Sequence, residues 1–339
     1  MRVFRGFHHP DIAPACALTI GNFDGVHRGH QAMLALLTNE ARHRGVASCV
    51  MTFEPHPRDY FAALARSAEA AGRDPQPGAQ KNMSAPARIA TLRDKLSELE
   101  RCGIDQAVVL RFDAALAGLS PQAFVEQVLV AGVHARYVLV GDDFRFGARR
   151  AGDYAMLDAA GDALGFDVAR MMSYEVHGAR VSSSAVRAAL AAGDMPLAAS
   201  LLGRPYSISG HVQHGRKLGR ELGFRTLNLR FAHPKPAAMG IFVVRVLGLG
   251  DTPLPGVASL GSRPTVDDSG RVLLETHVLD WPAVLGPEGG YGRLIRVELL
   301  ARLHDERRYA SLDELRAAIA DDTALARRWF AREAPASQA

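Results

Sequence analysis

Cysteine and long apolar runs are scarce in this 339-residue chain. Its three cysteines, Cys16, Cys49 and Cys102, stand far apart without a CxxC pair, so the sequence gives no sign of a disulfide framework or a zinc site. No run of about eighteen apolar residues occurs, and the opening segment MRVFRGFHHPDIAP lacks the apolar stretch of a signal peptide. We expect reduced core thiols, a cytoplasmic location and no membrane partner.

The excess of positive charge is small. Lysine and arginine number 40 against 36 aspartates and glutamates, which gives a formal net charge of +4. The arginines are dispersed, no nucleic-acid-binding motif is present, and small phosphate-bearing molecules satisfy the same charge. We therefore expect no nucleic-acid partner, and a monomer or weak homo-oligomer. An apolar fraction of 48% and the length of the chain predict a folded protein with two domains.

The first half of the chain alternates strand-like apolar runs with helical patterns. ACALTIGNF and ASCVMTF are typical of strands, and between them Met33, Leu36, Leu37 and Ala41 mark one face of a helix. This alternation predicts an α/β, Rossmann-like domain over residues 1–190, with a parallel sheet and ligands outside the carboxyl ends of its strands. Residues 67–82 lack periodicity and resemble a surface insertion.

The pattern changes in the second half. A helix is predicted from about Ser184 to Leu202, and it ends at Gly203-Arg204-Pro205, so residues 191–204 are interpreted as a linker. The short, β-branched runs that follow are typical of an antiparallel barrel or sandwich, and we expect a β-barrel over residues 205–333. Ser311 and Glu314 form a capping box ahead of an amphipathic helix, which we expect to close the barrel.

The segment GNFDGVHRGH stands where the first strong strand gives way to a helix. Gly21, Gly25 and Gly29 let the backbone approach a ligand, and the start of a helix attracts an anion. His27 and His30, three residues apart, lie on one face of the first turn and can point at one phosphate. This arrangement suits nucleotidyl transfer, which needs positioning and charge stabilisation. Without its glycine-rich context, HRGH would equally suit an ordinary polar helix start.

Two further segments have weaker patterns. In VSSSAVR, Ser182 to Ser184 offer hydroxyl and amide groups and Arg187 adds charge one turn later, although the serines can equally well only cap a helix. Residues 210–229, GHVQHGRKLGRELGFRTLNL, contain many glycines and basic residues. This composition suits either a phosphate-binding loop or a basic surface loop. Glu275 lies on a predicted strand, where a general base or a solvent-facing glutamate is possible.

Taken in order along the chain, GNFDGVHRGH, FEPHP, VGDDFRFG and VSSSAVR resemble the adenylyl-transfer half of the bacterial bifunctional riboflavin kinase and FMN adenylyltransferase family. The resemblance implies that FMN and ATP give FAD and pyrophosphate in this half. It implies catalytic roles for His27, His30 and Arg187. It further implies nucleotide contacts from Gly21, Asn22, Phe23, Asp24, Gly25, Gly29, Asp143, Ser182, Ser183 and Ser184, and flavin contacts from Phe53, Pro55, His56 and Pro57.

The second half resembles the riboflavin kinase part of the same family through GFRTLN, where relatives read GFPTAN, and through LETHVLD. The resemblance implies that Thr226 and Asn228 hold the Mg²⁺ of ATP, that Glu275 is the catalytic carboxylate, and that riboflavin becomes FMN. Arg225 replaces a proline and His304 replaces an arginine, so a single-activity adenylyltransferase with a degenerate kinase domain is the alternative. Nucleotide contacts are also expected from Gly215, Lys217, Gly219 and Gly223.

Overall fold

The computed structural model describes most of the chain, and by its internal contacts the chain divides into two compact units. Unit 1 consists of Met1–Pro86 and Lys95–Val181, and unit 2 of Ala87–Asp94 and Ser182–Ala339. Lys217, Gly219 and residues 73–82 of the predicted insertion lie outside the described residues, whereas residues 67–70 form the last turn of a helix. The described residues are 1–72, 84–172, 174–176, 179–215, 223–262, 272–286 and 288–333.

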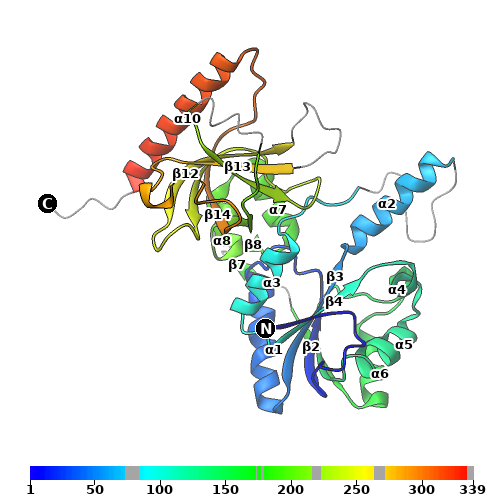
Figure 1. The fold of residues 1–339 in the computed structure, drawn as a ribbon. Helices are drawn as coiled ribbons and strands as arrows, with labels where there is room; N and C mark the ends of the chain where they lie inside the picture. The colour runs from blue at the N-terminus through cyan, green and yellow to red at the C-terminus, as the bar shows by residue number, and fades with distance from the viewer. Residues whose placement is uncertain are drawn as a thin grey trace. The chain divides into compact units, whose positions relative to one another are not determined.

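Unit 1 is built on a six-stranded sheet in the order β1-β4-β3-β2-β5-β6, and all five pairings are parallel (Figure 1). The predicted parallel α/β domain is confirmed, and β1 is a strand that the sequence did not predict. The strands are β1 (Arg2–Arg5), β2 (Cys16–Ile20), β3 (Ala47–Glu54), β4 (Gln106–Arg111), β5 (Ala135–Gly141) and β6 (Asp167–Met171), with a small hairpin of β7 (Glu175–Val176) and β8 (Ala179–Arg180).

Helices cover both faces of this sheet. On one face, Leu34, Leu37 and Ala41 of α1 form a buried apolar cluster with Leu99 of α3. On the other face, Val128 of η1 and apolar side chains of α6 belong to a second buried cluster. Leu36, expected on the buried face of α1, is 51% exposed, because the helix turns Leu34 inward instead. The helices are α1 (Arg28–Arg44), α2 (Pro57–Ala70), α3 (Leu92–Arg101), α4 (Ala114–Gly118), α5 (Pro121–Ala123), η1 (Phe124–Val130), η2 (Ala148–Arg150) and α6 (Tyr154–Leu164).

The strand order reverses at β2. After β2 the chain adds β3 and β4 on one side, and β5 then pairs with the other side of β2. In open α/β sheets the crevice at such a switch point, outside the carboxyl ends of the strands, is the usual ligand site. The segment Gly21–His30 follows β2 and therefore lies at this position.

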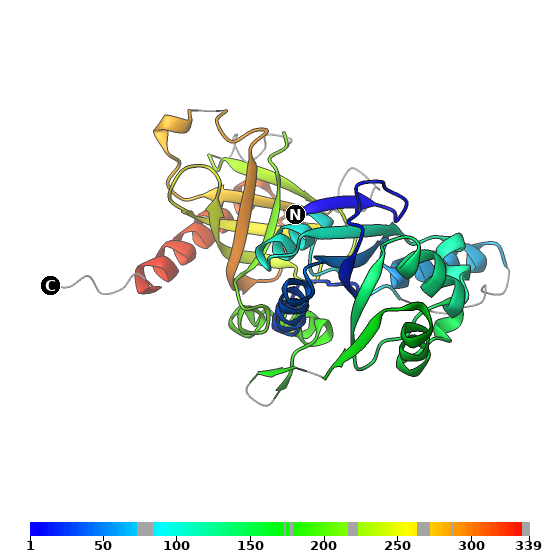
Figure 2. The same cartoon turned by 90° about the horizontal axis from the view of Figure 1, so that it is seen from below.

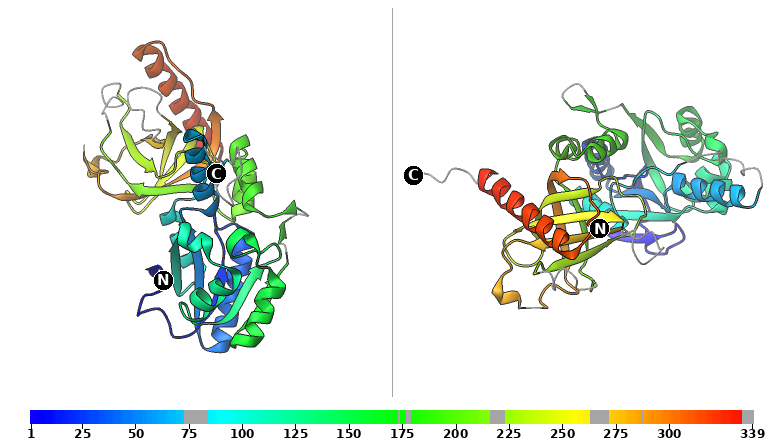
Figure 3. Two further views of the ribbon diagram at one scale, coloured as in Figure 1. Left: turned by 90° about the vertical axis from the view of Figure 1, so that its right-hand side faces the viewer. Right: turned by 90° about the horizontal axis from the view of Figure 1, so that it is seen from above.

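Unit 2 contains a six-stranded antiparallel sheet in the order β10-β13-β12-β11-β14-β9. An isolated bridge between Gln213 and Asn228 links the segment after β9 to β10, so the sheet nearly closes, as the sequence predicted. Figures 2 and 3 show α10 along the outside of the barrel, where Ala326 packs with Val243 and Val257. The elements are β9 (Tyr206–His211), β10 (Thr226–Phe231), β11 (Gly240–Leu247), β12 (Leu254–Ser262), β13 (Val272–Val278), η3 (Ala283–Leu285), β14 (Leu294–His304) and α10 (Leu312–Glu333).

Two short helices stand where one long helix was predicted. α7 (Ser183–Ala192) ends at Gly193 in the left-handed region, φ 77°, and α8 (Met195–Leu202) begins after Asp194, which accepts a hydrogen bond from the Leu197 amide. Half of the expected capping box at α10 is present: the Glu314 amide donates to Ser311 Oγ at 3.2 Å, but Glu314 Oε2 accepts from the Ala310 amide at 2.9 Å in place of the Ser311 amide.

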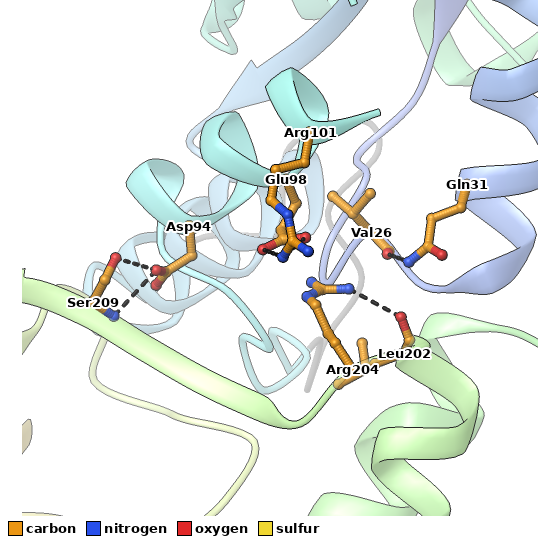
Figure 4. Close-up of polar contacts among 8 residues, drawn as sticks. All are labelled: Val26, Gln31, Asp94, Glu98, Arg101, Leu202, Arg204 and Ser209. Atoms are coloured by element: carbon orange, nitrogen blue, oxygen red, sulfur yellow. Dashed lines mark hydrogen bonds and ion pairs between the residues drawn. The ribbon is translucent and has the colours of Figure 1, made fainter. Parts of the chain in front are cut away.

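Residues 87–94 lie apart in sequence from the rest of unit 2 but pair with it. The Arg88 amide donates to Lys235 O at 2.8 Å, and the Ala237 amide donates to Arg88 O at 2.9 Å. Asp94 accepts hydrogen bonds from the amide and the hydroxyl of Ser209, the amide at 3.1 Å (Figure 4). This segment therefore adds main-chain and side-chain hydrogen bonds to the barrel unit.

Candidate functional site

The loop that follows β2 has an unusual backbone. Phe23 (φ 47°), Gly25 (φ 88°) and Val26 (φ 42°) all adopt positive φ, which is uncommon for phenylalanine and valine. Gln31 Nε2 donates to Val26 O at 2.8 Å and holds the end of the loop against α1 (Figure 4). Such strain persists where the surrounding structure imposes it, often at ligand sites.

His27 and His30 lie together at the start of α1. Their rings stack with centroids 3.7 Å apart, and His27 Nδ1 caps the helix by accepting from the His30 amide at 3.3 Å. Burial lowers the pKa of His30 well below 6.5, and the charges of His27 and Lys95 lower it further. His30 is thus a neutral imidazole at pH 7, which suits hydrogen bonding to a phosphate rather than acting as a cation. Its Nδ1 is buried without a hydrogen-bond partner among the described residues.

Gly29 is required by the close approach of its neighbours. A Cβ at this position would lie 3.3 Å from the His27 ring and 3.4 Å from Val181 O. Val181 directly precedes the VSSSAVR serines, so the chain enters that motif beside the first turn of α1. In unit 2, Ser182 caps α7 by accepting from the Ala185 amide at 3.2 Å, and Arg187 Nε donates to Ala87 O at 2.6 Å.

The two predicted nucleotide aspartates differ in environment. Asp24 is 1% exposed in the loop after β2, whereas Asp143 is exposed in the turn after β5. Its neighbour Asp142 forms an ion pair with Arg180 at 3.4 Å. Both positions follow strands that are adjacent in the sheet, at the carboxyl edge where ligands bind in this fold.

The FEPHP segment ends β3 and begins α2. His56 is buried and caps α2, where its Nδ1 accepts from the Arg58 amide at 3.0 Å, and Pro55 is exposed. Phe53 lies edge-on to Phe112, with ring centroids 5.8 Å apart. Phe112 also contacts two aromatic rings of α2 that the sequence patterns did not single out. These are Tyr60 and Phe61, with centroids at 5.5 and 5.7 Å. The four rings give this edge an aromatic surface.

The predicted kinase residues of unit 2 meet on the outer face of the barrel. Asn228 of β10 stands directly opposite Glu275 of β13, and Thr226 stands opposite His277. Directly paired residues of an antiparallel sheet project to the same face, so Thr226, Asn228 and Glu275 share one surface. Asn228 Oδ1 is buried without a hydrogen-bond partner among the described residues, and such an acceptor suits a cation.

A second carboxylate lies beside this cluster. Ser259 of β12 is paired with Glu275, and its hydroxyl donates to Glu306 Oε1 at 3.1 Å. Burial raises the pKa of Glu306, the hydrogen bond from Ser259 lowers it, and the charge of Glu275 raises it further. The sequence did not single out Ser259 or Glu306, because their approach depends on strand pairing and on the chain path after β14.

Arg225 and His304, the two residues that depart from the family pattern, both make other contacts. The Arg225 guanidinium lies 4.3 Å from the Trp281 ring centroid and donates to Gly286 O at 3.2 Å. These contacts fix the chain just before Thr226 in place of the missing proline. His304 Nε2 lies 2.7 Å from Asp322 Oδ1 and Nδ1 lies 2.7 Å from Asp305 O, so this ring ties the end of β14 to α10.

The fold and its two polar clusters define a class: a two-domain, nucleotide-dependent transferase with a Rossmann-like unit and a β-barrel unit. The family model for FAD synthetase matches residues 9–185, and the model for riboflavin kinase matches residues 202–330. The chain belongs to the bifunctional riboflavin kinase/FMN adenylyltransferase family.

Relatives match over nearly the whole chain. A bifunctional riboflavin kinase/FMN adenylyltransferase of Escherichia coli K12 is 45% identical over 99% of this chain and all of the relative. The protein of the same description from Pseudomonas fluorescens is 42% identical, over 96% of this chain and 97% of the relative.

A solved structure from Streptococcus pneumoniae, described as a macrolide-efflux protein, has a TM-score of 0.71 and 25% identity. The likeness covers 97% of this chain and all of that structure, and it supports the two-domain fold. Among the described residues, no helix is both long and apolar enough to span a bilayer.

Proposed function

We propose that the chain converts riboflavin to FMN in unit 2 and FMN to FAD in unit 1, with ATP as donor in both steps. The presence of both matching domains in one chain, with relatives similar over their full length, is the observation that supports it. Chromatography of the products from riboflavin and Mg-ATP tests it, and FMN followed by FAD is expected. If FMN supplied directly were converted but riboflavin were not, the single-activity alternative would hold.

In adenylyl transfer, a phosphate oxygen of FMN attacks the α-phosphorus of ATP. The new oxygen–phosphorus bond forms as the bond to pyrophosphate breaks. We assign the backbone of the Gly21–Val26 loop and the start of α1 to binding the phosphates. His27 and neutral His30 stabilise the charge that develops on them. Ser182 to Ser184 and Arg187 are proposed to contact the leaving pyrophosphate, and Asp24 and Asp143 the nucleotide or its metal.

In the kinase step, the terminal hydroxyl of the riboflavin side chain attacks the γ-phosphorus of ATP, and ADP leaves. Glu275 orients this hydroxyl and accepts its proton. The pairing of Asn228 with Glu275 on adjacent strands supports these assignments of metal ligand and base. Glu306 and Ser259, next to Glu275, set the local charge of this face.

Thr226 and Asn228 would hold the Mg²⁺ that accompanies ATP. The residues fit this ion, because Asn228 Oδ1 is buried without a partner among the described residues and Thr226 adds a second oxygen on the same face. When bound, Mg²⁺ with ATP neutralises charge on the phosphates. Adding a chelator in excess of Mg²⁺ is expected to stop FMN formation, measured as ADP release.

Gly215→Ala is expected to lower FMN formation by about tenfold or more. A Cβ at Gly215 would lie 2.9 Å from Asn228 Cγ and closer still to its Nδ2, so the amide must move from its position opposite Glu275. FAD formation from supplied FMN serves as the internal control for folding.

Gly210→Ala is the matched control, because its Cβ would make only an ordinary contact of 3.7 Å with Leu229. Equal kinase rates in the two variants would contradict the assigned role of Asn228.

A further inference from the structure

Lys95 is a lysine in the interior of unit 1. It lies in α3 and is only 1% exposed, although ammonium groups almost always remain in water. Its Nζ donates to Thr52 Oγ1 at 3.2 Å, and Thr52 is itself fully buried near the end of β3. Burying an ammonium group is unfavourable unless specific partners compensate. A buried lysine at this position therefore requires a reason beyond packing.

Thr52 connects Lys95 to the phosphate loop. Its hydroxyl accepts from Lys95 Nζ and donates to Asn22 O at 3.3 Å. Asn22 stands second in the Gly21–Val26 loop, just ahead of Phe23 and its strained backbone. The chain of hydrogen bonds thus runs from α3 through β3 to the loop that opens α1.

The side chains around this chain of contacts have spare hydrogen-bonding capacity. Asn22 Oδ1 and His30 Nδ1 are both buried and have no hydrogen-bond partner among the described residues. Lys95 is also close enough to His30 for its charge to lower the pKa of that ring, after the larger effect of burial and that of His27. Buried polar atoms are nearly always satisfied in native proteins, so these positions are organised for a bound group.

We propose that Lys95 is a positioning residue for adenylyl transfer: through Thr52 its ammonium group fixes Asn22 and the loop that receives the phosphates of ATP. The inference rests on the adenylyl-transfer function proposed above. Because Lys95 is only 1% exposed and its Nζ donates to Thr52, we assign it a role through Thr52 and not in contact with the substrate.

The test uses the full-length chain and compares Lys95→Met, Thr52→Val and the double variant. Each single substitution keeps the approximate shape of the side chain and removes one end of the contact. The kcat for FAD formation from FMN and ATP is expected to fall about tenfold or more in each, with the KM for FMN changed less than about threefold. The double variant is expected to be no less active than the less active of the two single variants, since both substitutions remove the Lys95–Thr52 hydrogen bond.

Two controls separate positioning from damage to the fold. Thr52→Ser keeps the hydroxyl and is expected to retain more activity than Thr52→Val, whereas Arg101→Met removes an exposed cation of the same helix and should have no effect. FMN formation by the same preparations reports the integrity of the rest of the chain.

Three outcomes would overturn the proposal: FAD formation within about twofold of the parent in Lys95→Met, independent losses that multiply in the double variant, or full activity in Thr52→Val. If Lys95→Met fails to fold, the activity of Thr52→Val alone tests the proposal. Undiminished FAD formation in His27→Ala would instead show that the site itself is wrongly placed.

Discussion

His27→Ala is expected to lower FAD formation by about two to three orders of magnitude while riboflavin phosphorylation by the same chain continues at its parent rate. The imidazole stands at the start of α1, stacked on His30 at 3.7 Å, at the switch point of the sheet. The kinase residues belong to a different unit, so the two activities are affected separately. The rates are measured as FAD from supplied FMN and as FMN from riboflavin.

The cap of α1 provides a sharper version of this experiment. His27 Nδ1 accepts from the His30 amide, and losing this cap alone costs about 1 kcal/mol of stability. His27→Asn restores an amide oxygen that caps helices well, so it separates the cap from the imidazole. We expect His27→Asn to melt like the parent and yet remain deficient in FAD formation. His43→Ala, an exposed histidine of the same helix, is the matched control, and an equal loss in that variant would contradict the assignment.

Glu275→Gln is expected to show the reverse pattern, with FMN formation reduced about 10²- to 10⁴-fold and FAD formation from supplied FMN unchanged. The substitution keeps the size of the side chain but removes the carboxylate that we propose as acceptor of the proton from the riboflavin hydroxyl. It preserves the place opposite Asn228, so ATP binding should change little. Single-turnover assays of ADP and FMN release would measure the chemical step directly.

Glu298→Gln on β14 is the control for Glu275→Gln. Glu298 is also a strand glutamate of the barrel, and it pairs with Arg245 at 3.4 Å rather than with the Asn228 cluster. A parallel fall of both activities in Glu275→Gln would show that the carboxylate supports the fold and not the reaction. Comparable kinase losses in the two variants would have the same meaning.

Local sequence patterns were sufficient for the architecture. Alternating strand and helix periods predicted the parallel sheet, and short β-branched runs with glycine turns predicted an antiparallel barrel or sandwich. The break between α7 and α8 was missed, because the apolar pattern continues across Gly193 while the backbone there is left-handed. Leu36 was placed on the wrong face of α1 for a similar reason: the position of the apolar stripe depends on which neighbours the helix meets.

Of the candidate-site residues, some were predictable from local sequence and others depend on tertiary packing. His27 and His30 are close in sequence, and their spacing predicted their proximity, although His27 caps α1 with an extended backbone and does not lie in its first turn. Lys95 gave no signal, because TLRDKLSELE has the composition of an ordinary amphipathic helix and its burial depends on where α3 packs. Nor does the sequence alone fix the register that pairs Asn228 with Glu275, or the approach of Glu306 to Ser259.

Arg225 illustrates how a departure from a family pattern is accommodated. Proline would restrict the chain before Thr226 through its ring. In this chain the guanidinium does so through contacts with Trp281 and Gly286 O, and His277 Nδ1 lies 2.8 Å from the Arg225 carbonyl oxygen. The support for the loop has therefore moved from the main chain to side-chain contacts.

On β10 and β13 the barrel keeps its buried apolar residues and its proposed reactive residues on opposite sides, whereas on β11 and β12 the outward Val243 and Val257 pack against α10. Along β10, Leu227 and Leu229 point into the largely apolar interior, while Thr226 and Asn228 point outward. Inward positions of the strand are therefore constrained by packing, and outward positions by the proposed reaction. The outward positions of β10 and β13 can therefore change with less effect on folding than the inward ones, which tolerate only changes that conserve volume. A library confined to the outward positions of these two strands would search for new phosphate acceptors while leaving the scaffold intact.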